Sequence, residues 1–221
     1  METPAWIEAL ERRLGGWSVP HLVRGLVVLN ALAFLLEMSS PGFTNVLLLD
    51  RSGLLQGEWW RALTFLFAAG GTKESLGILF FGLWMMVTWM FGEGLESAWG
   101  SFKLTLYLAI PVVLLVAVVW FLPPGYASHT ILLTSLFLAF ATLYPDLELM
   151  LFFILPVKCK WLAWVSAAFI LLEFLGSPAS RPMILASLSS YFLFFFPGWW
   201  GNLRLQWEAR SRRERFRGDD E

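Results

Sequence analysis

The chain has 221 residues, of which 57% are hydrophobic and 15% are charged, and its formal net charge is −1. A soluble domain carries roughly 25% charged residues, so this excess of apolar side chains needs lipid as its solvent and argues against a soluble enzyme. The single cysteine, Cys159, excludes an internal disulfide, and two histidines add too few ligands for a typical zinc site. We therefore expect no metal and no cofactor.

The N-terminal segment 1–20 is expected to be cytoplasmic and to contain a short amphipathic surface helix. Trp6, Ile7 and Leu10 recur at helical spacing within residues 4–16. The segment mixes acidic and basic residues and lacks the basic and apolar regions of a signal peptide. The first apolar segment is therefore expected to remain in the protein as a transmembrane helix.

Six apolar runs follow this segment, separated by connectors rich in Pro, Gly, Ser and Asp. They cover residues 22–38, 76–91, 104–122, 128–144, 161–175 and 182–197. Several are shorter than the ~20 residues that usually cross the hydrocarbon core. Helices of this length would thin the bilayer around them.

The distribution of basic residues predicts the orientation of these helices. If six helices cross the membrane, twelve of the 16 Lys and Arg residues lie on the side of the two termini and four on the other side. The positive-inside rule then places both termini in the cytoplasm. Compact loops and tails suggest a multi-pass protein of a bacterial inner membrane.

The chain is accordingly divided into the N-terminal segment, a membrane domain at 21–200 and a basic cytoplasmic tail at 201–221. The tail contains six arginines within 204–217. It is expected to lie on anionic lipid headgroups, with docking of a cytosolic partner as the alternative. Nothing else in the chain favours binding of nucleic acid.

Three sequence blocks stand out in the membrane domain. The first lies in the long connector 39–75, where Trp59 and Trp60 are expected at the membrane interface and Arg61 at the lipid headgroups. The blocks are Gly57–Phe67 (GEWWRALTFLF), Phe91–Leu104 (FGEGLESAWGSFKL), and Ala139–Pro145 followed by Phe152–Leu162 (FFILPVKCKWL).

These blocks, in this order on six apolar segments, resemble the rhomboid and derlin superfamily over about residues 20–200. The resemblance implies an all-α integral membrane protein, a six-transmembrane-helix rhomboid-like bundle with a long interfacial loop between helices 1 and 2. It also implies two groups of residues that maintain this fold. They are Glu58, Trp59, Trp60 and Arg61 in the loop, and Glu96, Trp99 and Gly100 at the end of helix 2.

The resemblance does not extend to the catalytic groups of rhomboid proteases. Those enzymes use a serine in a Gly-x-Ser-Gly motif on helix 4, a histidine on helix 6, and a His and an Asn on helix 2. The equivalent positions hold Thr130, Met183, Phe80 and Trp84. These residues do not supply an activated nucleophile with a base and oxyanion donors, and residues 130–221 contain no histidine. We expect no catalytic site of the rhomboid type.

Several other polar residues are assigned structural roles. Ser128 is expected to cap helix 4, and Glu37 and Glu173 are expected to reach water from the helix ends, with gating or partner contact as the alternative. Cys159 is read as an unmodified interfacial thiol, with acylation as the alternative. Four small residues on helix 6 are expected to pack against neighbouring helices. They are Ala186, Ser187, Ser189 and Ser190.

The resemblance implies an inactive rhomboid-like protein that binds transmembrane segments of other proteins without cutting them. Its expected partners are membrane lipids and the transmembrane helices of other membrane proteins. A stoichiometric subunit of a larger membrane complex is the first alternative. The second is an active intramembrane serine or threonine protease that uses Thr130 or Ser128. A transporter is disfavoured, because the helices lack paired charges at mid-membrane depth.

Overall fold

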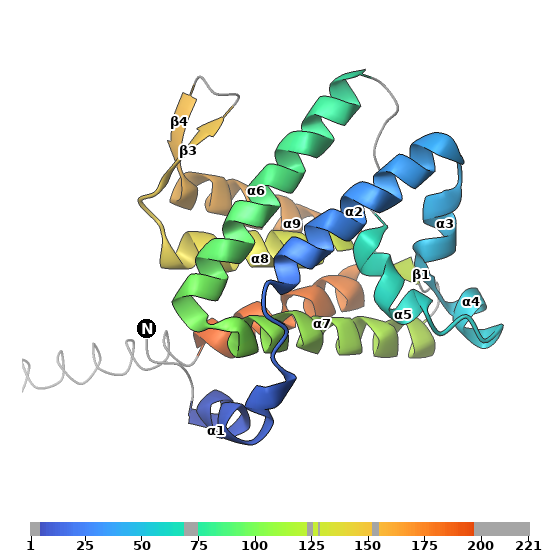
Figure 1. Ribbon diagram of the computed structural model, residues 1–221, viewed down its shortest axis with the longest axis horizontal. Helices are drawn as coiled ribbons and strands as arrows, with labels where there is room; N and C mark the ends of the chain where they lie inside the picture. The colour runs from blue at the N-terminus through green and yellow to red at the C-terminus, as the bar shows by residue number, and fades with distance from the viewer. Residues whose placement is uncertain (1–4, 69–74, 123–125, 128, 152–154, 197–221) are drawn as a thin grey trace, which may run out of the picture.

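The computed structural model describes residues 5–68, 75–122, 126–127, 129–151 and 155–196. The basic tail 201–221 and the expected cap Ser128 lie outside these residues. Most of the described chain is helical (Figure 1). Within it, four helices are long and apolar enough to cross a membrane. They are α2 (Leu22–Ser39), α6 (Ser75–Trp99), α7 (Ser101–Phe121) and α9 (Cys159–Gly176).

Two further helices are apolar but shorter, namely α8 (His129–Leu143) and the helix Arg181–Phe196. Each of the six predicted apolar segments therefore coincides with a helix. The main difference is in α6, which continues to Trp99 instead of ending near residue 91. Its last two turns contain most of the second sequence block, so that block is helical up to the break at Gly100.

The long connector between α2 and α6 has its own structure. It contains four short helices and one strand, which pairs with a second short strand in the connector that follows α7. These elements are α3 (Phe43–Leu47), β1 (Leu49–Asp50), α4 (Arg51–Leu55), α5 (Arg61–Thr64), η2 (Phe65–Phe67) and β2 (Tyr126–Ala127). The β1–β2 pairing fixes the connector against the end of α7.

A second strand pair, β3 (Glu148–Leu151) with β4 (Leu155–Lys158), stands where the sequence suggested only a loop between α8 and α9. Pro156 in β4 disfavours a helix there and is compatible with an edge strand. The described chain is thus mostly helical, as predicted, with two small antiparallel strand pairs in its connectors. The hairpin projects from the helices beside α6 (Figure 1).

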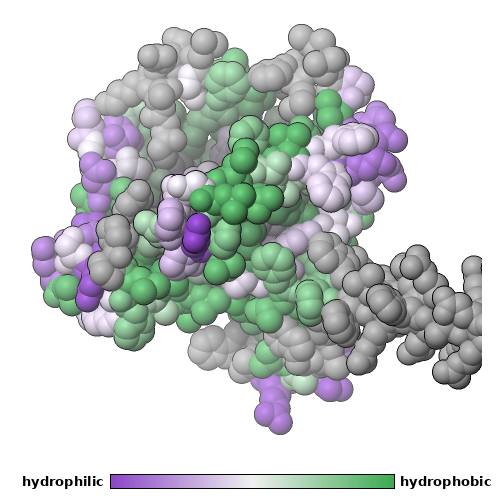
Figure 2. Space-filling view, turned by 180° about the vertical axis from the view of Figure 1, so that it is seen from behind, coloured by the Kyte–Doolittle hydropathy of each residue, from purple (hydrophilic) through white to green (hydrophobic). Residues whose placement is uncertain are grey.

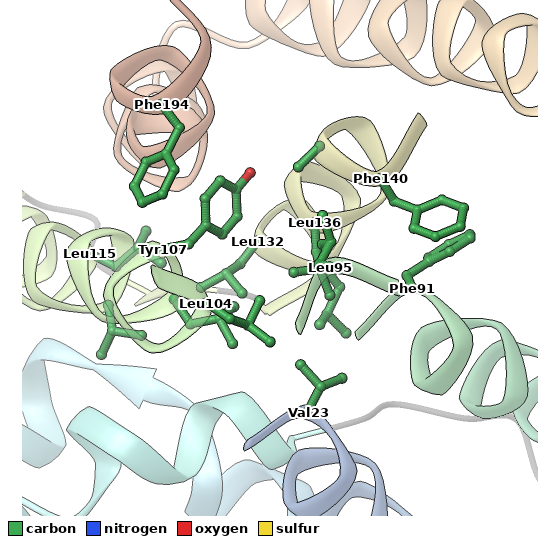
Figure 3. Close-up of a cluster of buried hydrophobic side chains, with 14 of the residues drawn as sticks. Val23, Phe91, Leu95, Leu104, Tyr107, Leu115, Leu132, Leu136, Phe140 and Phe194 are labelled. Atoms are coloured by element: carbon green, nitrogen blue, oxygen red, sulfur yellow. The ribbon is translucent and has the colours of Figure 1, made fainter. Parts of the chain in front are cut away.

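The core is formed where α6, α7, α8 and the helix Arg181–Phe196 meet. Leu104 and Tyr107 of α7 face Leu132 of α8, and Phe194 packs against the Tyr107 ring at 5.3 Å between centroids (Figure 3). The Tyr107 hydroxyl donates to the Ser135 carbonyl at 2.9 Å. A second hydroxyl contact, 3.0 Å between Thr142 Oγ1 and the Tyr191 hydroxyl, ties α8 to the last described helix.

Helices α2 and α6 approach closely at Gly92. A Cβ atom on Gly92 would lie 2.3 Å from Val23 Cγ1, so only glycine allows this contact without a shift. On α2, Asn30 donates from Nδ2 to the carbonyls of Leu26 and Leu66 at 2.9 and 3.0 Å. Its amide thereby binds η2 to α2 in the apolar interior.

The N-terminal helix, α1 (Ala5–Leu14), lies where the sequence predicts an amphipathic helix, and its apolar side packs on the protein. Ile7 is fully buried in the main core cluster. Glu11 lies 3.7 Å from the Lys103 amino group at the start of α7. The apolar face of an amphipathic helix packs against a core, but the sequence alone did not show which part of the protein this face meets.

Candidate functional site

Arg61 is the centre of a polar cluster in the connector between α2 and α6. Its guanidinium pairs with Glu58, lies 3.0 Å from Asp50 Oδ1, and donates to the carbonyls of Asn45 and Leu48 at 2.9 and 3.0 Å. Only 13% of the Arg61 side chain is exposed. Protein carboxylates and carbonyls thus lie at its Nε and Nη1 atoms, where the sequence suggested lipid headgroups. We call Asp50, Glu58 and Arg61 the Arg61 cluster.

Asp50 links this cluster to the start of α4. Its carboxylate accepts hydrogen bonds from the Ser52 hydroxyl and from the Gly53 amide, the latter at 3.0 Å. Partial burial raises the pKa of Asp50, but these hydrogen bonds and the charge of Arg61 lower it by more. The net pKa therefore lies below the ordinary value of an aspartate. Asp50 is therefore ionised at neutral pH, and its charge holds both Arg61 and the helix end.

Trp59 and Trp60 lie on the outside of the same region. Their exposed fractions are 63% and 53%, and the Trp59 ring stacks on Trp120 of α7 at 5.8 Å between centroids. Exposed tryptophans at the ends of apolar helices are typical of the boundary between lipid and water. The interfacial role of the two tryptophans stays a prediction.

Glu96, near the C-terminal end of α6, connects this helix to the beginnings of α2 and α7. One carboxylate oxygen accepts from the His21 amide at 2.9 Å and from the Ser101 hydroxyl at 2.7 Å. His21 precedes α2 with φ 56°, a left-handed conformation that is uncommon outside glycine. Glu96 thus fixes the beginnings of α2 and α7, while the pair Arg24–Glu93 joins α2 to α6 nearby.

Trp99 and Gly100 form the turn between α6 and α7. The Trp99 ring packs against Tyr107 and Phe194 at 5.5 and 5.4 Å between centroids. Gly100 has φ 83°, which a residue with a side chain rarely adopts. The second sequence block therefore encodes a helix end, a sharp turn and a helix start.

The four positions equivalent to rhomboid catalytic groups do not form a polar site. Phe80 and Trp84 are 50% and 40% exposed on α6, Thr130 is exposed in the first turn of α8, and Met183 is half-buried against the core. Phe80 and Met183 carry no group that accepts or donates a proton. Neither of these two side chains can therefore act as a nucleophile, a base or an oxyanion donor.

The small residues of the helix Arg181–Phe196 lie on its inward side. Ala186, Ser187 and Ser190 are buried, and Ser189 is half-buried with its hydroxyl donating to the Ala186 carbonyl at 2.7 Å. Small side chains allow close approach of neighbouring helices. Their burial fits a packing role.

Two residues with more than one possible role have defined surroundings in the structure. The half-buried Glu37 carboxylate accepts from the Gly42 and Thr44 amides at 2.9 and 2.8 Å, so it caps α3. Cys159 is completely buried, which argues against acylation of its thiol. Both roles depend on contacts between segments that the sequence alone does not specify.

Helix α9 carries the largest unpartnered apolar face among the long helices described. Only 6% of the apolar stretch of α9 is buried, against 28% in α2 and in α6 and 39% in α7. Its inward side packs on α8 and on the helix Arg181–Phe196 through Ala163, Ile170 and Phe174. We call its most exposed residues the α9 face. They are Trp161, Trp164, Val165, Phe169, Leu171, Leu172 and Leu175.

The view from behind shows hydrophobic side chains across much of this side of the molecule (Figure 2). Apolar patches larger than a few hundred Å² on proteins mark contact with membranes or with other proteins. A helical chain with such faces belongs to the class of integral membrane proteins. No family model, no curated protein and no solved structure matches the chain.

Proposed function

We propose that this protein is a catalytically inactive, rhomboid-like membrane protein that binds transmembrane helices of other proteins on its α9 face. The resemblance of the three sequence blocks supports the family. The observation that favours helix binding is the exposure of α9, which is long enough to span a membrane and yet is almost unburied. Its Trp, Phe and Leu side chains match the surface of another transmembrane helix.

The short helices support the same function. Helix α8 has 15 residues, and at ~1.5 Å per residue it is roughly 22 Å long, against a hydrocarbon core of ~30 Å. The surrounding bilayer would thin to match it. A thinner bilayer favours lateral entry of a partner helix beside the bundle.

The α9 face also fits a stoichiometric subunit of a larger complex, because an obligate partner would cover it permanently. A protease that uses Thr130 or Ser128 is disfavoured by the equivalent positions on α6 and on the last helix. In the proposed topology the six helices cross a bacterial inner membrane, with both termini in the cytoplasm.

Purification of the tagged protein from its native membrane in mild detergent, with mass spectrometry of the bound proteins, separates these functions. We expect many uncut single-pass proteins at low occupancy. One partner set at fixed stoichiometry would establish the subunit instead, and shortened partners that disappear in Thr130→Val would establish the protease.

A paired variant locates the binding surface in this experiment. Trp164→Ala with Phe169→Ala removes two large side chains from α9 that the described protein does not bury, and it should reduce the bound proteins severalfold. Leu32→Ala with Leu35→Ala is the matched control on α2, where both side chains are also exposed. Equal loss in both variants would show that the α9 face is not selective.

A further inference from the structure

A single acidic residue, Glu173, interrupts the apolar surface of α9. It lies less than one turn before the helix end at Gly176, and its side chain is exposed. Phe169, four residues earlier on the same helix, is 68% exposed, and the preceding residue, Leu172, is 64% exposed. A carboxylate among exposed apolar side chains near a helix end is costly in lipid and is a candidate for a specific contact.

Glu173 has no ion pair or side-chain hydrogen bond among the described residues. The basic residue that contacts this end of α9 is Arg181, and it is engaged elsewhere. Its Nε donates to the Phe174 carbonyl at 2.9 Å, and its guanidinium lies 5.4 Å from the centre of the Phe174 ring. Arg181 thus satisfies a carbonyl at the helix end, and the Glu173 charge remains available.

The apolar face and the carboxylate at this end of α9 together define which partner helix fits it. The apolar face suits a transmembrane helix, and the carboxylate suits a cation at the same depth. A helix with only apolar side chains would cover Glu173 and leave its charge without a partner, which disfavours that complex. A helix with a lysine or arginine near its end satisfies the charge and buries the apolar face together.

We propose that the α9 face selects transmembrane helices that carry a basic residue about one turn from the membrane boundary. In this complex the Glu173 carboxylate forms an ion pair with the basic residue. The inference rests on the proposed function and adds to it the chemistry of the partner. Glu173 is a specificity-determining residue, whereas Trp164 and Phe169 supply the apolar contact.

The test uses the full-length protein in phosphatidylcholine vesicles that contain about one-fifth phosphatidylglycerol. The probes are three synthetic leucine–alanine helices with a central photoreactive residue, identical except for Lys, Leu or Glu one turn from one end. Covalent yield after illumination is measured for the wild-type protein, Glu173→Gln and Glu173→Lys. Thermal unfolding of each variant checks that the fold is intact, which is expected because Glu173 is exposed.

We expect the wild-type protein to capture the Lys helix roughly two- to fivefold more than the Leu helix, as for an exposed ion pair. This ratio should fall to about one in Glu173→Gln, and Glu173→Lys should prefer the Glu helix. A Lys preference that survives in Glu173→Gln would overturn the inference.

The outcomes also separate this inference from the proposed function. Equal capture of all three helices that is lost with Trp164→Ala and Phe169→Ala would leave the α9 face as a docking site and refute the role of Glu173. Capture of lipid alone, with no helix, would refute both.

Discussion

At the scale of single residues, the connector between α2 and α6 depends on Arg61. Replacing Arg61 with Ala removes the cation beside the carboxylates of Asp50 and Glu58 and the donor to two carbonyls. We expect this to lower the free energy of unfolding by about 2 to 3 kcal/mol, because broken charge networks that are mostly buried are costly. Thermal unfolding in detergent measures the change.

Arg51→Ala is the matched control for this substitution. Arg51 is an exposed arginine at the start of α4 in the same connector, so its loss should change stability by less than about 0.5 kcal/mol. Equal effects of the two substitutions would contradict the central role of Arg61.

The Arg61 cluster also predicts a pH dependence at the residue scale. The pKa of Asp50 is below 3.8 in the folded protein, so its charge stabilises the fold above that pH. This contribution is lost as the pH falls from about 4 through the folded pKa. The melting temperature of wild-type protein should therefore fall toward that of Asp50→Asn in acid.

The two proteins should differ most near neutral pH. Their melting temperatures are compared in one detergent between pH 3 and pH 7, where the detergent itself does not titrate. A difference that stays constant over this range would show that the ionised Asp50 carboxylate does not stabilise the connector.

At the scale of elements, the crossing of α2 and α6 depends on a glycine. Gly92→Leu places a side chain where Val23 already lies, since even a Cβ would approach Val23 Cγ1 to 2.3 Å. Overpacking of this kind costs about 1 to 3 kcal/mol. The loss is measured as a lower unfolding temperature.

Gly82→Leu tests the same change elsewhere on α6. No other group of the described chain lies within 4 Å of a Cβ built there, so the new leucine meets lipid and should be nearly neutral. If Gly82→Leu were as destabilising as Gly92→Leu, glycine content and not the contact with Val23 would explain the effect.

The elements also show which parts of the fold the sequence encodes locally. All six apolar segments were predictable, because hydropathy and length are properties of each segment alone. The turn at Gly100 also has a local signal, a glycine directly after the aromatic end of α6. The strand pair β3–β4 had only a weak signal, because four-residue strands give little periodicity.

Contacts between distant segments were not predictable from one sequence. Asp50 and Arg61 are separated by a helix and a turn, and nothing in either residue indicates that the carboxylate and not a lipid headgroup pairs with the guanidinium. The docking of Ile7 into the core was missed for the same reason. Glu58 and Arg61 were named from the sequence, whereas Asp50, the contacts within the Arg61 cluster and the α9 face were not.

At the scale of the whole molecule, burial is unevenly distributed among the helices. The core joins α6, α7, α8 and the last described helix, whereas α9 contributes little to it. Because every long helix needs a partner for its apolar surface, the exposed α9 face must meet lipid or another protein. The proposed function assigns part of that surface to partner helices.

Photo-crosslinking in the native membrane tests this assignment most directly. A photoreactive amino acid replaces Phe169 on α9 in one protein and Leu35 on α2 in another, since both side chains are largely exposed. The account predicts covalent adducts with several membrane proteins from position 169 and mainly lipid adducts from position 35. Lipid adducts alone from both positions would contradict it.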